Sequence, residues 1–180
     1  MSIKITYFVH GTTIDNEKGL ATGWEQGELS ALGIEQSKKL PSLIKENDFD
    51  VIFCSDLKRA VNSANLAFGG KYKIIEDKHL REINYGDLTL GKDFKNCLKD
   101  YIEKPFSNGE SYKDVEKRVR VFIEFLKENY QNKHIAIVAH QAPQLALDVI
   151  SSGKTWQQAI DEDWRKTKAW QPGWNYFVDC

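Results

Sequence analysis

The sequence predicts an α/β fold, a three-layer sandwich with a mainly parallel sheet and helices on both faces. Three segments share one order of elements: a short β-rich run, a polar turn and then a helix-like stretch. The β-rich runs show little polar alternation, which is typical of strands buried on both faces. No repeat, low-complexity tract or Pro/Gly-rich linker divides the 180 residues. We therefore expect a single domain over residues 1–180.

The predicted strands are short. They cover residues 3–9, 49–54 and 135–139, and residues 73–75 form a weaker candidate for a further strand. Each of the three stronger runs is five to seven residues long and ends in a polar turn. Strands that alternate with helices favour parallel pairing.

The clearest helix is predicted over residues 112–129. Ser111 and Asp114 have the spacing of an N-terminal capping box. Apolar residues then follow at helical spacings of four, three and four, namely Val115, Val119, Phe122 and Leu126.

Three further helices are indicated by local signals. Pro143 suits the first turn of a helix, and Thr155 with Gln158 has capping-box spacing. The stretch from Ser30 to Lys45 is also helix-like, with Pro41 expected to kink or end it.

Composition narrows the classes of function. Lys and Arg number 25 against 26 Asp and Glu, a net charge of −1, so no basic surplus favours nucleic acid. The longest strongly apolar run, residues 135–139, is too short to span a membrane, and the N-terminal segment does not resemble a signal peptide. Three widely spaced cysteines favour a reducing compartment over a disulfide framework. We expect a cytoplasmic protein that binds neither nucleic acid nor membrane.

Residues with catalytic chemistry follow the predicted strands. His10, Arg59 and His140 each lie just past the end of a strand, where ligands bind in open α/β sheets. An imidazole there can act as a nucleophile, a general base or a metal ligand. His79 and His134 have no such position, so we expect no catalytic role for them.

Five sequence blocks, in order along the chain, resemble the histidine phosphatase superfamily, which includes the cofactor-dependent phosphoglycerate mutases. The blocks are HGTTIDN at residues 10–16, SDLKRAVNSA at 55–64, LREINYGD at 80–87, GES at 109–111 and IVAH at 137–140. The resemblance covers residues 3 to about 150 and implies the phosphoglycerate mutase-like fold.

The resemblance implies a mechanism for hydrolysis of a small phosphate monoester. His10 would attack phosphorus and become a phosphohistidine, Arg59 and His140 would bind the phosphoryl oxygens, and Glu82 would act as general acid and then general base. No metal and no cofactor are implied. The expected substrate-binding residues are Gly11, Thr13, Asn16, Thr22, Gly23 and Gln141.

The chain also departs from the family pattern. Val9 stands where the resemblance implies an arginine that binds the phosphoryl group, Gln141 replaces a glycine, and Thr12 replaces a glutamate or glutamine. Loss of one preorganised donor costs about 3 kcal/mol, roughly 100- to 1000-fold in rate. Either another cation replaces the missing one or turnover is weak or absent. The candidate cations are Arg81, Arg165 and Lys166.

Two alternatives to a phosphatase therefore remain. One is a weakened or inactive relative that binds a phosphorylated or other anionic ligand. The other is a mutase, which the sequence Thr22-Gly23-Trp24 resembles, although only 26 residues separate Glu82 from Gly109 and leave no room for the mutases' insertion. The expected partner is a small phosphate ester or anion, and the sequence predicts no oligomeric state.

The C-terminal part holds four of the five tryptophans, at positions 156, 164, 170 and 174. They either pack against the sheet or form an aromatic wall for an apolar or cyclic leaving group. Arg165 and Lys166 beside Trp164 form either a cationic rim or a solvated face.

Overall fold

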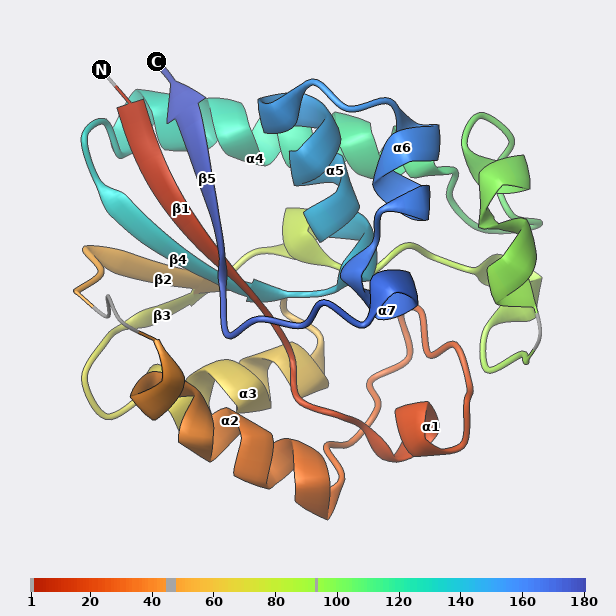
Figure 1. Ribbon diagram of the computed structural model, residues 1–180, viewed down its shortest axis with the longest axis horizontal. Helices are drawn as coiled ribbons and strands as arrows, with labels where there is room; N and C mark the ends of the chain where they lie inside the picture. Colours follow the sequence, from red (N-terminus) through yellow and green to blue (C-terminus); the bar gives the residue numbers. More distant parts are fainter. Residues whose placement is uncertain (1, 45–47, 93) are drawn as a thin grey trace.

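Five strands form one sheet, in the order β3-β2-β4-β1-β5. The computed structural model describes residues 2–44, 48–92 and 94–180. The first four strands in chain order pair in parallel, and β5 pairs antiparallel with β1 at the edge. The mainly parallel sheet that the sequence predicts is confirmed (Figure 1). The strands are β1 (Ser2–Val9), β2 (Val51–Cys54), β3 (Ile74–Glu76), β4 (His134–Ala139) and β5 (Trp174–Asp179).

Helices cover both faces of the sheet, which confirms the three-layer fold class. Figure 1 shows α2 and α3 on one face and α4, α5 and α6 on the other. The α-helices are α1 (Ile14–Glu17), α2 (Ala31–Leu43), α3 (Lys58–Phe68), α4 (Tyr112–Asn129), α5 (Gln141–Ser152), α6 (Trp156–Asp161) and α7 (Trp164–Thr167). Three 3-10 helices are η1 (Lys78–Leu80), η2 (Gly86–Leu88) and η3 (Phe94–Tyr101).

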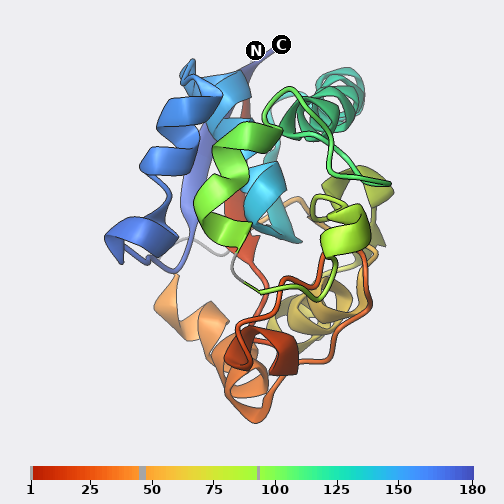
Figure 2. The ribbon, with the colours of Figure 1, turned by 90° about the vertical axis from the view of Figure 1, so that its right-hand side faces the viewer.

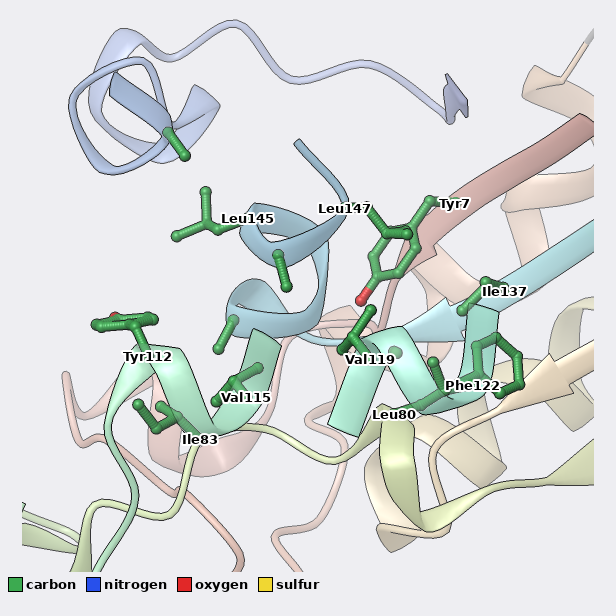
Figure 3. Close-up of a cluster of buried hydrophobic side chains, with 14 of the residues drawn as sticks. Tyr7, Leu80, Ile83, Tyr112, Val115, Val119, Phe122, Ile137, Leu145 and Leu147 are labelled. Carbon is green, nitrogen blue, oxygen red and sulfur yellow. The ribbon is translucent and has the colours of Figure 1, made fainter. Parts of the chain in front are cut away.

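The sheet separates two hydrophobic cores. Successive residues of β1 face opposite sides of the sheet, so Ile5 and Tyr7 join the core under α4 and α5, whereas Phe8 joins the core against α3. Figure 3 shows Tyr7 of β1 pointing toward Leu147 of α5 and Val119 of α4 in the larger core. Burial on both faces explains why the strands read as continuous apolar runs.

The predicted helix starts are confirmed at two capping boxes. Ser111 accepts a hydrogen bond from the amide of Asp114, and Thr155 accepts one from the amide of Gln158, each with the reciprocal contact. Helix α4 spans the predicted residues 112–129.

Helix α2 differs from the prediction at its C-terminal end. Ser30 caps it as expected, but the helix continues through Pro41 to Leu43. Proline disturbs the turn that precedes it, so its place close to the helix end leaves most of the helix intact. Residue Lys45, the predicted limit, lies outside the described residues.

The C-terminal strand β5 was not among the predicted elements. Its side chains alternate, with Tyr176 and Val178 buried and Asn175 and Phe177 exposed, as in an edge strand that covers one side of a core. No helix in the described part of the chain has the length and apolar character needed to cross a lipid bilayer.

Candidate active site

His10 and His140 meet at the carboxyl edge of the sheet because the strands that carry them are neighbours. They follow β1 and β4, which run parallel with Val9 opposite Ala139. The two imidazole rings lie 5.0 Å apart between centroids, at 60°. Figure 2 looks at this edge, which the segments of α1, η3 and α7 surround.

The His10 ring is held in one tautomer. Its Nδ1 lies 2.7 Å from the carbonyl oxygen of Gly11, which only accepts hydrogen bonds, so Nδ1 carries the proton and Nε2 has a free lone pair. Burial lowers the pKa of His10 to about 3; Arg59 also lowers it, and the Gly11 contact acts in the opposite direction. The imidazole is therefore neutral near pH 7, the form that a nucleophile requires.

His140 is fully buried and its backbone is fixed by a tyrosine. The Tyr7 hydroxyl donates to the His140 carbonyl at 2.7 Å and accepts from the His140 amide at 3.0 Å. Within the described residues, neither ring nitrogen of His140 has a hydrogen-bond partner. Burial, and then the charge of Arg59, lower the pKa of His140 well below its usual value. A buried imidazole without a protein partner is suited to bind a ligand.

Arg59 brings a buried positive charge to the same edge. It lies in the first turn of α3, which begins after β2, and only 2% of its surface is exposed. Its Nη1 donates to the carbonyl of Glu25 and its Nη2 to that of Gly23, both at 2.7 Å. These bonds orient the guanidinium and attach the loop at residues 22–25 to the site.

Glu82 sits against the N-terminus of α5. Its Oε1 accepts from the amides of Ile83 at 3.0 Å and Ala142 at 2.9 Å, and its Oε2 accepts from the amide of Gln141 at 3.1 Å. A carboxylate has about four acceptor positions, so one position on Oε2 remains for another partner. The helix N-terminus further favours a negative charge there.

A cavity of about 260 Å³ collects these side chains. Three of the four catalytic candidates line it, His10, Arg59 and Glu82. His140 is not part of the lining, although its ring centroid lies 5.0 Å from that of His10. Four predicted substrate-binding residues also line it, namely Asn16, Thr22, Gly23 and Gln141. The remaining walls come from residues that were not among the predicted catalytic or substrate-binding residues: Val9, Thr12, Leu20, Ala21, Tyr85, Trp164 and Arg165.

Two predicted substrate-binding residues lie outside this lining, Thr13 and Gly11. Thr13 is fully buried, and its hydroxyl accepts from the amide of Asn16 as the N-cap of α1. Asn16 returns the contact through its Oδ1 to the Thr13 amide, which fixes the Asn16 side chain at the cavity wall. Thr13 therefore acts on the cavity only by orienting Asn16.

Gly11 and Gly33 allow two backbone segments to touch. A Cβ atom on Gly11 would lie 2.4 Å from the carbonyl oxygen of Gly33, and one on Gly33 would lie 2.0 Å from that of Thr12. These distances exclude any side chain at either position without movement of the backbone. The contact presses the start of α2 against the loop that follows His10.

A second, more apolar cavity adjoins the first. It measures about 430 Å³ and shares Val9, His10, Thr12 and Trp164 with it. Its other walls include Leu40 of α2 and Trp170. Of the C-terminal tryptophans, Trp156 is a buried core residue, whereas Trp164 and Trp170 line this cavity. Their use as an aromatic wall for a leaving group stays a prediction.

Of the three candidate cations, Arg165 is the one that lines the cavity beside His10. Arg81 is committed elsewhere, because its Nε and Nη2 donate to the two carboxylate oxygens of Asp56 at 2.8 and 2.6 Å. Lys166 pairs with Asp161 at 3.6 Å. Among the described residues, no group of three or more His, Cys, Asp or Glu is arranged to hold a metal ion.

Fold and site together define a member of the histidine phosphatase superfamily. The chain belongs to branch 1 of that superfamily, whose family model matches residues 7–151. This confirms the family that the five sequence blocks indicated.

Its relatives include both phosphatases and mutases. The adenosylcobalamin/alpha-ribazole phosphatase of Escherichia coli (strain K12) is 29% identical over 143 residues, 73% of this chain and 70% of that protein. The alpha-ribazole phosphatase of Shigella flexneri has a crystal structure that aligns with a TM-score of 0.78 and 27% identity, over 88% of this chain and 84% of that one. A 2,3-bisphosphoglycerate-dependent phosphoglycerate mutase of Arthrobacter sp. (strain FB24) is 37% identical over 112 residues, 59% of this chain and only 45% of the mutase.

Proposed function

We propose that this protein is a phosphatase that hydrolyses a small phosphate monoester through a phosphohistidine at His10. The observation that carries the proposal is the His10 imidazole itself. It is neutral, its proton is fixed on Nδ1 by the Gly11 carbonyl, and it shares a cavity with Arg59 and Glu82. A neutral imidazole beside a guanidinium fits nucleophilic attack on phosphorus.

The reaction would run in two balanced steps. In the first, Glu82 takes up a proton from solvent, Nε2 of His10 forms a bond to phosphorus as the ester P–O bond breaks, and Glu82 gives that proton to the leaving oxygen. In the second, water attacks the phosphohistidine, Glu82 accepts the water's proton, and inorganic phosphate leaves. Arg59 and His140 would stabilise the charge on the phosphoryl oxygens in both transition states.

The size of the cavity supports a small substrate. Its volume of about 260 Å³ lies just below the range of roughly 300–1,000 Å³ typical of sites for drug-sized ligands. Coverage does not separate the two activities, because the phosphatase relative is matched over 70% of its length and two mutase relatives over 45% and 77% of theirs. Hydrolysis is favoured over transfer to a second acceptor because only 26 residues separate Glu82 from Gly109, too few for the insertion that the family resemblance implies for a mutase.

Phosphate release from a panel of phosphate monoesters tests the proposal. We expect turnover by the wild type that is lost in His10→Ala and kept in His79→Ala. His79 is the matched control, because its ring pairs with Asp77 at 2.8 Å outside the cavity. No release above His10→Ala on any ester would refute the phosphatase and favour an anion-binding relative. Transfer to an added alcohol or phosphoglycerate in place of water would favour the mutase.

A further inference from the structure

Arg165 is the second guanidinium of the cavity, and it comes from the C-terminal part of the chain. It lies on α7, after all the blocks that resemble the family. Among the described lining residues, Arg59 and Arg165 are the two that carry a permanent positive charge. The side chain of Arg165 is 28% exposed, so it is partly shielded from water.

A buried carboxylate holds Arg165 in place. Asp163 is only 4% exposed, and its Oδ1 accepts from Nη1 of Arg165 at 2.9 Å and from the Arg165 amide at 3.0 Å. Its Oδ2 accepts from the side-chain amide of Gln141. A carboxylate this deeply buried needs such partners, so Asp163 fixes α7 and the guanidinium together.

Gln141 connects this arrangement to the catalytic candidates. It is the first residue of α5, directly after His140, and its backbone amide donates to Glu82 at 3.1 Å. Its side chain therefore reaches Asp163 while its backbone holds Glu82. Gln141 thus has a structural role, because it links α7 to the edge of the sheet where His10 and His140 lie.

The aromatic residues of the tail support the other side of the guanidinium. The Arg165 guanidinium carbon lies 4.3 Å from the centroid of the Trp164 ring. Trp164 itself stacks on Trp174 at 5.5 Å and donates from Nε1 to Gln144 at 3.2 Å. An arginine that is stacked and paired in this way loses little further freedom when it binds an anion.

The negative charge of a phosphate ester requires more positive charge than Arg59 alone supplies. A monoester carries up to two negative charges near neutral pH, and both imidazoles are neutral with lowered pKa values. Two of the five N–H groups of Arg59 donate to backbone carbonyls. Val9, the residue before His10, offers only an aliphatic side chain to the cavity.

We propose that Arg165 binds the phosphoryl group as the second guanidinium of the site, with Asp163 and Gln141 as its positioning residues. The inference rests on the proposed function in one respect, that the ligand of this cavity is a phosphoryl group. In this proposal, the positive charge that residue 9 of β1 lacks is supplied by Arg165 in the C-terminal part of the chain.

Binding of inorganic phosphate, measured by titration calorimetry, tests Arg165 without any need for turnover. We expect Arg165→Met to weaken binding about tenfold or more, the range for loss of a hydrogen bond to a charged group. Lys166→Met, which removes a neighbouring cation outside the cavity, should stay within about twofold of the wild type. Equal binding by the two variants, or no phosphate binding by the wild type, would overturn the proposal.

A second variant controls for the case in which Arg165→Met fails to fold. Arg165→Gln keeps a planar group above Trp164 and the capacity to donate to Asp163, but removes the charge. Thermal unfolding shows which of Arg165→Met and Arg165→Gln keeps the native fold. Any variant that keeps it must lose phosphate affinity about tenfold or more. In Gln141→Leu, which leaves Arg165 intact, the positioning role predicts weaker phosphate binding. The double variant with Arg165→Gln should bind phosphate no more weakly than Arg165→Gln alone.

Ester hydrolysis by the same variants distinguishes failure of this inference from failure of the proposed function. If no ester is hydrolysed but phosphate binding depends on Arg165, the phosphatase proposal fails and the role of Arg165 stands. If turnover depends on His10 but neither turnover nor phosphate binding changes in the folded Arg165 variants, the role of Arg165 fails and the phosphatase proposal stands.

Discussion

Mild acid should destabilise this fold through His10, and a single substitution should remove that sensitivity. Burial lowers the pKa of His10 in the native protein to about 3, whereas an unfolded histidine titrates near 6.5. As the pH falls below 6.5, the unfolded chain therefore takes up a proton that the native protein does not. The contribution of His10 to stability is fully present above pH 6.5 and is lost as the pH falls toward 3.

The magnitude follows from the difference between the two pKa values. Each pH unit below the unfolded pKa costs about 1.4 kcal/mol per proton. At about pH 5, one and a half units below 6.5, the free energy of unfolding should be about 2 kcal/mol lower than at about pH 7.5 because of His10 alone. His140, whose pKa is also lowered, acts in the same direction and stays present in the variant described next.

Urea unfolding followed by tryptophan fluorescence measures this effect in the wild type and in His10→Asn. The asparagine amide keeps a donor for the Gly11 carbonyl but does not titrate. The wild type should lose about 2 kcal/mol more than the variant between about pH 7.5 and about pH 5. Equal losses in the two proteins, within about 0.5 kcal/mol, would refute the view that the native protein holds His10 in its neutral form.

Three further substitutions test local features of the fold by their effect on the free energy of unfolding. Gly33→Ala would normally stabilise a helix by about 1 kcal/mol, but its Cβ would lie 2.0 Å from the Thr12 carbonyl, so we expect a loss of about 1–3 kcal/mol; a gain would contradict the close contact. Trp156→Phe removes the Nε1 donor that lies 2.7 Å from the buried Glu116 and should cost about 1–3 kcal/mol, whereas a change below about 0.5 kcal/mol would show that the bond is unimportant. Gly153→Ala places a side chain at φ 67° after α5 and should cost about 1 kcal/mol, and an unchanged midpoint in thermal unfolding would argue against the left-handed cap.

The sequence predicted the half of the site that depends on strand ends. His10 and His140 follow β-prone runs whose lack of polar alternation favours buried strands, and parallel strands place their carboxyl ends at one edge. The spacing of Ser111 and Asp114 likewise fixed the start of α4, because a capping box is a purely local pattern. Local chemistry of this kind can be inferred from one sequence.

The rest of the site depends on contacts between distant segments. The approach of Glu82 to the amides of Gln141 and Ala142 requires the path of the chain after β3, which no local pattern specifies. The choice of Arg165 among three candidate cations depends on the return of the tail along the sheet, where β5 pairs with β1. Pairing between strands this far apart along the chain leaves only a weak alternating pattern in the sequence.

The contact between Gly11 and Gly33 also limits how this protein can evolve or be engineered. A Cβ on Gly11 would meet the carbonyl of Gly33 and one on Gly33 would meet that of Thr12, so a substitution at either position must move the backbone at the start of α2 and costs stability. If the proposed function holds, mutations that broaden the range of substrates are expected elsewhere around the apolar cavity. Leu40 is the accessible choice, because Gln36 on the same helix accepts hydrogen bonds from Thr12, two residues after His10. A library built on Leu40 should thus change which leaving groups fit while the geometry at His10 is preserved.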